Sequence, residues 1–341
     1  MSLNQLSQLY LPAIEDELRR ALSGGDAAYD LYYRMLNYHM GWVDADGTAI
    51  AAGAGGKRLR PLITLLTCAA VGGAWERALP LAAGLELLHN FSLLHDDIQD
   101  NSPLRRGRPT AWTLWGAAQA INAGDALFTL AHLAVQSLAE HGVPAATALR
   151  VLTAFDRTCL ALTQGQFLDM QFETRAQVGV AEYLAMIEGK TAALVAACTE
   201  LGGRVAGVDE ARGEHLRLFG RSLGLAFQIQ DDLLGIWGDP AVTGKSAASD
   251  LEKRKKSLPV VIGLERSPEF AAAYARPAAA DGPALSALVG QLEALGAHAE
   301  AQALAEAHTR EARAHLEAAR PAGAAAEALR ALADQLLNRS A

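Results

Sequence analysis

The sequence predicts an all-α protein in which a single helical bundle accounts for residues 1–341. Three observations favour this fold class. Apolar residues recur at every third or fourth position, as in Leu87, Phe91 and Leu94, which is the spacing of one helix face. Alternating β-branched runs bounded by hairpin turns are missing, so no sheet is expected. A repeat of fixed period, the sign of a solenoid, is also missing.

Glycine and proline divide the chain into the expected helices. In chain order, the predicted breaks are residues 53–56, 102–103, 142–144, 238–240 and 277–283. The Ala-rich stretch 284–341 has high helix propensity and is predicted to be helical. Length alone would suggest about two domains. The two acidic motifs described below instead favour one continuous domain.

Composition and charge narrow the functional classes. The chain is 51% hydrophobic, and its net charge of -8 argues against a general nucleic-acid binder. Basic residues nevertheless gather at 57–60, 105–108 and 253–256, which favours a small anionic ligand. The chain shows no signal peptide and no apolar run of about 20 residues, so we expect a soluble cytoplasmic protein without a membrane span. Its cysteines, which lack metal-ligand spacing and are expected to be buried thiols, are Cys68, Cys159 and Cys198.

The first acidic motif is the most informative segment. Asp96 and Asp100 are four residues apart and project from one face of a helix. Alone, such a pair is more often a solvated acidic patch, since like charges at this spacing cost only ~0.2–0.5 kcal/mol when exposed. The surroundings change this balance, because Ser102-Pro103 should end the helix and arginines 105, 106 and 108 follow on a loop. Carboxylate-bound metal ions and guanidinium groups could then hold one diphosphate together.

Two further segments carry charge suited to the same chemistry. Asp231-Asp232 is a second acidic pair inside an apolar stretch far downstream. Carboxylates in such surroundings are costly unless something positive neutralises them. Residues 55–61 offer another anion site on a flexible loop. Taken by itself, that segment is better interpreted as an exposed basic loop.

The order of these motifs resembles the trans-isoprenyl diphosphate synthase (polyprenyl synthetase) family. Gly-Gly-Lys-Arg-Leu-Arg-Pro at 55–61 precedes the acidic motif, in which His89, Ser92 and His95 also match, and Arg-Arg-Gly-x-Pro-Thr follows at 105–110. Later matches, in family order, are Gly124-Asp125, Gly165-Gln166, Lys190-Thr191, Phe227-Gln228-x-Gln230-Asp231-Asp232, Gly244-Lys245 and the segment 250–259. The resemblance spans residues 55–264 and implies a helical bundle around a central cavity.

The resemblance also implies a role for each matching residue. The carboxylates that hold Mg2+, with Mn2+ able to substitute, are Asp96, Asp97, Asp100, Asp231 and Asp232. The cations around the allylic diphosphate are Arg105, Lys190, Lys245 and Lys255. The pocket for isopentenyl diphosphate consists of Lys57, Arg60, His89 and Arg106. The polar residues near the reacting carbons are Thr191 and Gln228. Without the neighbouring matches, Lys190 would be interpreted as a solvated helix residue and Gln228 as a core amide.

The sequence departs from the family pattern at one position. The second motif is usually Asp-Asp-x-x-Asp, but here it ends in Gly235. Asp239 lies one helical turn further along the chain. The third carboxylate is therefore missing, and the resemblance does not assign the second metal shell in detail.

The implied reaction is head-to-tail prenyl transfer to isopentenyl diphosphate, with the product length set by the cavity below Asp96. Ser92 lies one helical turn below Asp96, and Phe91 is displaced ~7.5 Å along the helix axis. An aromatic residue followed by a small one at these positions resembles geranylgeranyl diphosphate synthases, so a C20 product is predicted. The alternative is that Phe91 simply belongs to the core.

Three other functions stay open at this point. The chain could make farnesyl or longer polyprenyl diphosphates, act as a class I terpene cyclase, or serve as a non-catalytic subunit of a heteromeric synthase. A cyclase would usually carry an Asn/Asp-Ser/Thr-Glu motif near Asp231, which is missing here, and would have no use for the Lys57 and Arg60 site. Family members commonly form homodimers, so a homodimer is expected.

Overall fold

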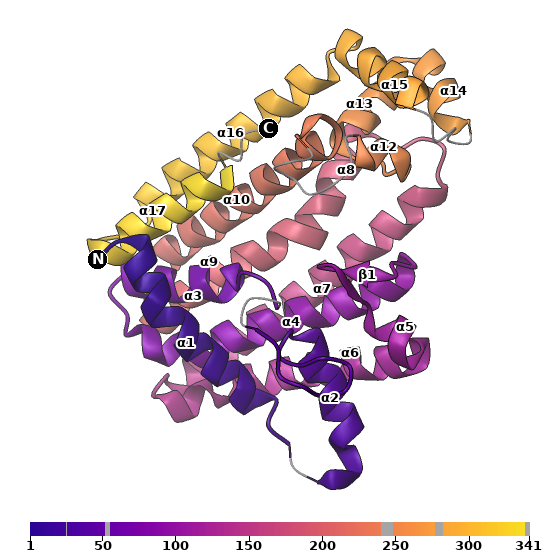
Figure 1. The fold of residues 1–341 in the computed structure, drawn as a ribbon. Coiled ribbons are helices and arrows are strands. Elements are labelled where there is room, and N and C mark those ends of the chain that lie inside the picture. The colour runs from indigo at the N-terminus through magenta and orange to yellow at the C-terminus, as the bar shows by residue number, and fades with distance from the viewer. Residues whose placement is uncertain (25, 52–54, 240–247, 277–281, 338–341) are drawn as a thin grey trace. The chain divides into compact units, whose positions relative to one another are not determined.

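The structure is a computed structural model that describes residues 1–24, 26–51, 55–239, 248–276 and 282–337 (Figure 1). These residues are predominantly helical with very few in strands, which confirms the predicted fold class. The elements are α1 (Leu3–Ala21), η1 (Ala27–Tyr29), α2 (Asp30–His39), α3 (Leu59–Ala70), η2 (Trp75–Ala78), α4 (Leu79–Gln99), β1 (Leu104–Arg105), β2 (Arg108–Pro109), α5 (Ala111–Trp115), α6 (Ala117–Gln136), η3 (Ser137–His141), α7 (Ala145–Thr174), α8 (Val180–Ile187), η4 (Glu188–Ala192), α9 (Ala193–Ala206), α10 (Glu210–Trp237), α12 (Ser249–Glu252), α13 (Leu258–Arg266), α14 (Pro268–Ala275), α15 (Gly282–Ala294), α16 (Ala297–Ala318) and α17 (Gly323–Leu337).

The expectation that the chain has no sheet is wrong at one place. Strands β1 and β2 form an antiparallel hairpin that pairs Leu104 with Pro109 and Arg105 with Arg108. Its turn is Arg106-Gly107, where φ is positive at both residues (53° and 73°), as a two-residue type I′ turn requires. Strands of two residues are too short to show an alternating pattern, so periodicity could not predict them.

Several predicted helix ends are confirmed. Helix α4 ends three residues before Ser102-Pro103, α7 begins directly after Pro144, and α10 ends at Trp237, just before Gly238. The Ala-rich stretch forms α15, α16 and α17. The breaks predicted at 53–56 and 277–283 lie partly outside the described residues.

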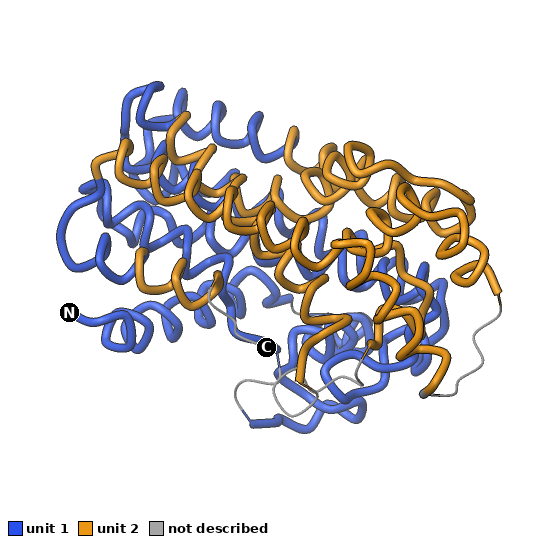
Figure 2. The backbone as a smooth tube through the Cα atoms, turned by 90° about the horizontal axis from the view of Figure 1, so that it is seen from above, with its two compact units in different colours: residues 1–156, 198–213, 321–329 blue, residues 157–197, 214–320, 330–341 orange. Residues whose placement is uncertain are grey.

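The chain forms two compact units (Figure 2). Unit 1 comprises residues 1–156, 198–213 and 321–329, and unit 2 comprises residues 157–197, 214–320 and 330–341. In unit 1, α4 and α6 pack closely because Gly84 has no side chain. A Cβ on Gly84 would lie 2.9 Å from the carbonyl oxygen of Ala131. In unit 2, Ile229 of α10 and Val261 of α13 belong to one buried core.

Two expectations about the chain's general character can be compared with the structure. In the part of the chain that the structure describes, no helix has both the length and the apolar character that crossing a bilayer demands. The cysteines are buried free thiols, as expected. Burial raises the pKa of Cys68 and Cys198 to about 12, so these two thiols are unreactive.

Candidate functional site

The first acidic motif lies at the carboxyl end of α4. Asp96 is partly exposed, Asp97 is 1% exposed, and Asp100 is the C-cap residue of the helix. The Arg105 guanidinium lies 2.7 Å from Asp97 Oδ1 through Nε and 3.6 Å from Asp96 Oδ2 through Nη2. Burial raises the pKa of Asp97, and the charge of Arg105 opposes that rise. The structure thus brings Asp96, Asp97 and Arg105 together.

The β1–β2 hairpin aims its three arginines differently. Arg105 faces the acidic motif, whereas Arg106 at the turn donates a hydrogen bond from Nη1 to the carbonyl of Gly55. Arg108 instead donates to the carbonyls of Tyr38 (3.1 Å) and Val43 (2.7 Å). Arg108 therefore has a structural role, and the hairpin, not a loop, separates the three side chains.

A basic pocket in unit 1 gathers the residues predicted for isopentenyl diphosphate. A cavity of about 670 Å³ is lined by Gly56, Lys57, Arg58, Leu59, Arg60, Glu86, His89 and Arg106. Arg60 stands in the first turn of α3, so the predicted flexible loop ends before it. Burial, reinforced by the charge of Arg60, lowers the pKa of His89 well below its usual value and keeps the imidazole neutral.

Arg58, which sequence reasoning left without a role, anchors the loop of this pocket. It is 4% exposed and adopts a left-handed backbone (φ 47°) at the start of α3. Its guanidinium lies 3.1 Å from Glu86 Oε1 and 2.7 Å from Glu15 Oε1. It also donates to the carbonyls of Met40 and Gly55. Lys57 and Arg60 are thereby left to face the cavity.

The two residues predicted to set product length lie on α4 within unit 1. The Phe91 ring packs against Phe128 of α6, with centroids 5.0 Å apart, and against His95 at 4.7 Å. Ser92 Oγ donates to the carbonyl of His89 at 2.7 Å. Phe128 was missed by sequence reasoning, because nothing local in the sequence says which α6 residue meets Phe91.

In unit 2, the second acidic motif divides between a buried and a partly exposed carboxylate. Asp232 is fully buried and accepts hydrogen bonds from the hydroxyl of Tyr183, from Gln228 Nε2 (3.2 Å) and from the backbone N–H of Leu258 (3.0 Å). Asp231, its neighbour on α10, is partly exposed. Asp232 therefore links α10 to α8 and to the start of α13.

Lys190 and Thr191 lie on a π-helical turn, η4, a distortion that often marks functional sites. This turn approaches α7 closely because Gly165 has no side chain. A Cβ on Gly165 would lie 2.1 Å from the backbone nitrogen of Lys190. Lys190 Nζ pairs with Asp169 of α7, a residue that sequence reasoning missed. Thr191 Oγ1 donates to Gln228 Oε1 at 3.0 Å, so the predicted polar pair is in contact.

Lys255 lies beside two carboxylates of unit 2. Its Nζ is 3.5 Å from Asp232 Oδ1 and 3.7 Å from Asp250 Oδ2. Burial acts to lower the pKa of Lys255, but these carboxylates outweigh it and raise the pKa above the usual value. The predicted residue Lys245 lies outside the described residues.

The donor set for a metal ion consists of aspartate carboxylates, the hard oxygen ligands that Mg2+ prefers. Within the residues that the structure describes, no group of three or more His, Cys, Asp or Glu side chains converges as a ready metal site. The first motif lies at the negative end of the α4 dipole, which favours a cation there. By donor chemistry the acidic residues fit the predicted ion, and a diphosphate would have to complete its coordination.

Comparison with known proteins agrees with this arrangement. The polyprenyl synthetase family model matches residues 47–286. A geranylgeranyl diphosphate synthase of Mycobacterium tuberculosis H37Rv is 47% identical over 249 residues, covering 72% of this chain and 70% of that protein. A (2E,6E)-farnesyl diphosphate synthase of the same strain is 46% identical over 226 residues, covering 66% of this chain but only 61% of that protein.

Solved structures of similar proteins superpose on nearly the whole chain. The polyprenyl synthetase of Streptomyces coelicolor A3(2) superposes with a TM-score of 0.90 at 34% identity, covering 98% of this chain and 100% of that one. The geranylgeranyl pyrophosphate synthetase of Pyrococcus horikoshii has a TM-score of 0.88 at 31% identity, covering 99% and 98%. The resemblance inferred from the motifs is thus confirmed, and the chain belongs to the polyprenyl synthetase family of prenyltransferases.

Proposed function

We propose that the chain condenses isopentenyl diphosphate with an allylic diphosphate, head to tail. The basic pocket carries this proposal. Lys57, Arg60 and Arg106 bring positive charge to a cavity of about 670 Å³, and neutral His89 adds a hydrogen-bonding group. Charge-assisted hydrogen bonds from such a set suit a diphosphate. A terpene cyclase takes a single diphosphate substrate, so it would have no use for a separate pocket for isopentenyl diphosphate.

We assign Mg2+, with Mn2+ able to substitute, to the two acidic motifs. The carboxylates are Asp96, Asp97, Asp100, Asp231 and Asp232. Asp97 and Asp232 are buried and hydrogen-bonded to Arg105 and Tyr183, so we give them an orienting role. The more exposed Asp96 and Asp231 are better placed to meet an ion.

Bound Mg2+ would stabilise the negative charge that develops on the departing diphosphate. Arg105, Lys190, Lys245 and Lys255 would hold that diphosphate while its bond to carbon breaks. Gln228 orients the hydroxyl of Thr191, whose oxygen dipole would steady the allylic cation. The double bond of isopentenyl diphosphate then attacks the cationic carbon. Loss of one proton to the released diphosphate leaves an allylic product five carbons longer.

We infer geranylgeranyl diphosphate as the product. The support is Phe91, which lies five residues before Asp96 and is braced by Phe128. Relatives of similar identity include synthases named for both geranylgeranyl and farnesyl diphosphate, so the aromatic contact carries this choice. A farnesyl or longer product is the alternative.

The test is product chromatography with each C5, C10 and C15 allylic starter, isopentenyl diphosphate and Mg2+. We expect every starter to be extended to a C20 diphosphate, and no product when isopentenyl diphosphate or the metal is withheld. A hydrocarbon formed from geranylgeranyl diphosphate alone would show a cyclase instead. A product of another length would refute only the C20 assignment.

Gly235 motivates a second candidate, a non-catalytic subunit of a heteromeric synthase, because it removes one acid from the second motif. The intact basic pocket makes this the weaker candidate. Activity of the purified chain alone would exclude it. Inactivity that a second subunit restores would establish it.

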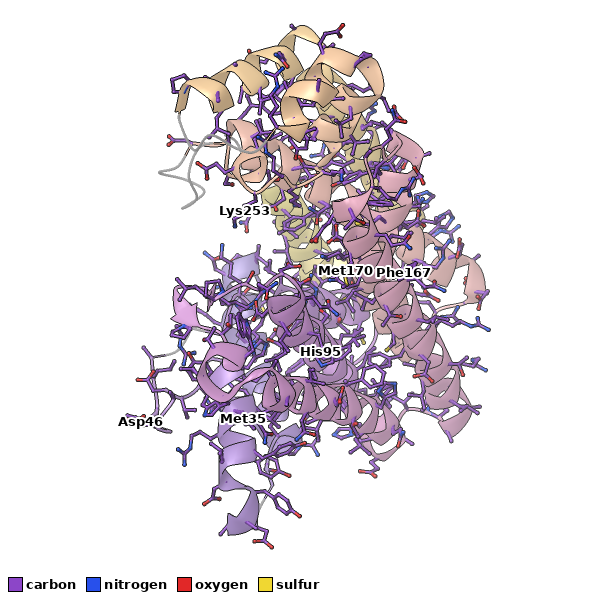
Figure 3. All side chains as sticks on the ribbon, turned by 90° about the vertical axis from the view of Figure 1, so that its right-hand side faces the viewer. Met35, Asp46, His95, Phe167, Met170 and Lys253 are labelled. Carbon is purple, nitrogen blue, oxygen red and sulfur yellow. The ribbon has the colours of Figure 1, made fainter. Side chains whose placement is uncertain are left out.

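We further propose a homodimer of single-domain chains in the cytoplasm. Leu149, Leu160 and Phe167 lie 11 and 7 residues apart on α7, which is one helix face, and are 66%, 58% and 59% exposed (Figure 3 labels Phe167). A second copy would cover these three apolar side chains. The boundary between the units falls inside continuous helices, among them α7, whereas domains are normally joined by exposed linkers.

A further inference from the structure

The π-helical turn η4 is in direct backbone contact with two helices of unit 2. A Cβ on Gly189, inside the turn, would lie 2.8 Å from the carbonyl oxygen of Ala161 on α7. A Cβ on Gly224 of α10 would lie 2.6 Å from the Cα of Ala192, the last residue of the turn. Because π-helical turns are rare, contacts from outside must favour this one over a continuous α-helix through α8 and α9.

The first residue of the turn is held by a two-pronged ion pair. Arg221 of α10 donates to Glu188 from Nε to Oε1 at 2.7 Å and from Nη2 to Oε2 at 2.6 Å. Hydrogen bonding from Arg221 lowers the pKa of Glu188, so this carboxylate is charged at neutral pH. Exposed ion pairs usually contribute little to stability, but a bidentate arginine–carboxylate pair is the exception. These two side chains are 31% and 44% exposed.

Arg221 belongs to the side of α10 that serves the candidate site. Arg221, Gly224 and Gln228 are spaced by three and four residues and therefore lie on one side of the helix. Gly224 meets Ala192, and Gln228 accepts the hydrogen bond from Thr191. This side of α10 thus contacts the first, fourth and fifth residues of the turn. The ion pair is the contact furthest from the reacting groups.

We propose that Arg221, acting through Glu188, holds η4 in its π-helical form and thereby positions Lys190 and Thr191 for the allylic diphosphate. Arg221 is therefore a positioning residue. Its role rests on the proposed function, which gives Lys190 and Thr191 their tasks. Without the ion pair, the turn can relax toward α-helical hydrogen bonding. A shift of one residue in register turns a side chain by about 100° around the helix axis, so even a partial relaxation would displace both groups.

A set of Arg221 variants tests this role. Arg221→Met removes the ion pair, and Arg221→Lys keeps the charge but cannot form the two-pronged contact. Arg221→Glu is made alone and together with Glu188→Arg, which exchanges the two charges. The matched control is Arg313→Met, which breaks the exposed Arg313–Asp334 pair elsewhere in unit 2. Each variant is measured for melting temperature, for kcat and KM with each substrate, and for hydrogen exchange of the backbone amides of residues 187–193.

We expect Arg221→Met to lower kcat/KM for the allylic diphosphate about tenfold, less than the roughly hundredfold that a misplacement of about 1 Å can cost. The KM for isopentenyl diphosphate and the melting temperature should match those of Arg313→Met. The amides of residues 187–193 should exchange faster in Arg221→Met and at the wild-type rate in Arg313→Met. Arg221→Lys should lie between wild type and Arg221→Met. The exchanged pair should recover much of the activity that Arg221→Glu loses.

The proposal is overturned if Arg221→Met has the allylic kinetics of Arg313→Met, or if the exchanged pair is no better than Arg221→Glu. Faster hydrogen exchange throughout unit 2, with a lower melting temperature, would show a general loss of structure and also overturn it. A wild-type protein without prenyl transfer would refute the proposed function and with it the tasks of the residues on η4. The exchange rates of residues 187–193 would still decide whether Arg221 holds the turn.

Discussion

Replacing Arg58 with methionine is predicted to destabilise the protein by about 3 kcal/mol, since breaking a buried ion pair by removing one partner costs ~3–5 kcal/mol. The structure places the expected value at the lower end. Arg58 and Glu86 are almost fully buried (3% and 4% side-chain exposure), but Glu15 is 33% exposed and can regain water. Glu86 also keeps a hydrogen bond from Asn90 Nδ2 at 3.1 Å.

The double variant Arg58→Met/Glu86→Gln should be less damaging than the single variant. With both charges removed, no uncompensated ion is left inside unit 1, and an amide at 86 can still accept from Asn90. We expect a coupling energy between the two positions of about 1–2 kcal/mol, within the range for residues in direct contact. Glu86→Gln alone should destabilise the protein less than Arg58→Met does, because Glu15 still compensates the charge of Arg58.

The assay is denaturant unfolding followed by far-ultraviolet circular dichroism, with initial rates measured in parallel. The control is Arg313→Met, which breaks the Arg313–Asp334 pair where both side chains are exposed (58% and 49%), and should change stability by no more than about 0.5 kcal/mol. Arg58→Met should also raise the KM for isopentenyl diphosphate, because Arg58 and Arg106 both bond to the Gly55 carbonyl. An Arg58→Met variant as stable as Arg313→Met, or strictly additive effects of Arg58→Met and Glu86→Gln, would refute this reasoning.

Three further outcomes are expected. Phe91→Ala should lengthen the product beyond C20, and Phe91→Ala/Phe128→Ala should lengthen it more, as seen by chromatography; an unchanged C20 profile would place the floor elsewhere. Burial lowers the pKa of His39 to about 3, from its ordinary value of 6.5. As pH falls from about 7 to about 5, only the unfolded chain then takes up this proton, so the free energy of unfolding decreases. His39→Gln should reduce this dependence on pH, as measured by urea unfolding at each pH. Leu160→Arg should shift the protein toward monomer in analytical ultracentrifugation, whereas the same sedimentation as wild type would contradict the α7 interface.

The helical fold was predictable because its signal is local. The three- and four-residue spacing in Leu87, Phe91 and Leu94 is carried by a single helix, α4, and Ser102-Pro103 marks the end of that segment without help from the rest of the chain. The β1–β2 hairpin was not predictable in this way. Its paired residues are too few to form a pattern, and its turn uses Arg106, a residue not typical of positive φ.

The site was predictable only for residues that belong to a motif. Glu86, Asp169 and Tyr183 contact Arg58, Lys190 and Asp232 respectively, but their partners lie 28, 21 and 49 positions away in the sequence. Tertiary packing brings such pairs together, and one sequence contains no record of it. Gly235 was visible in the sequence as a departure, but only the structure shows that a Cβ there would lie 2.5 Å from Asp250 Oδ2.

The paired aspartates of the two motifs divide their work because of helix geometry. Adjacent residues on a helix point about 100° apart, so two neighbouring carboxylates cannot face one ion in the same way. Asp97 and Asp232 are 1% and 0% exposed and hold Arg105 and Tyr183, while Asp96 and Asp231 remain partly exposed. In each pair, one acid fixes a neighbouring element and the other stays partly exposed. Removing the buried acid should therefore disturb the position of the hairpin or of α13, and removing the exposed acid should weaken metal-dependent binding without that disturbance.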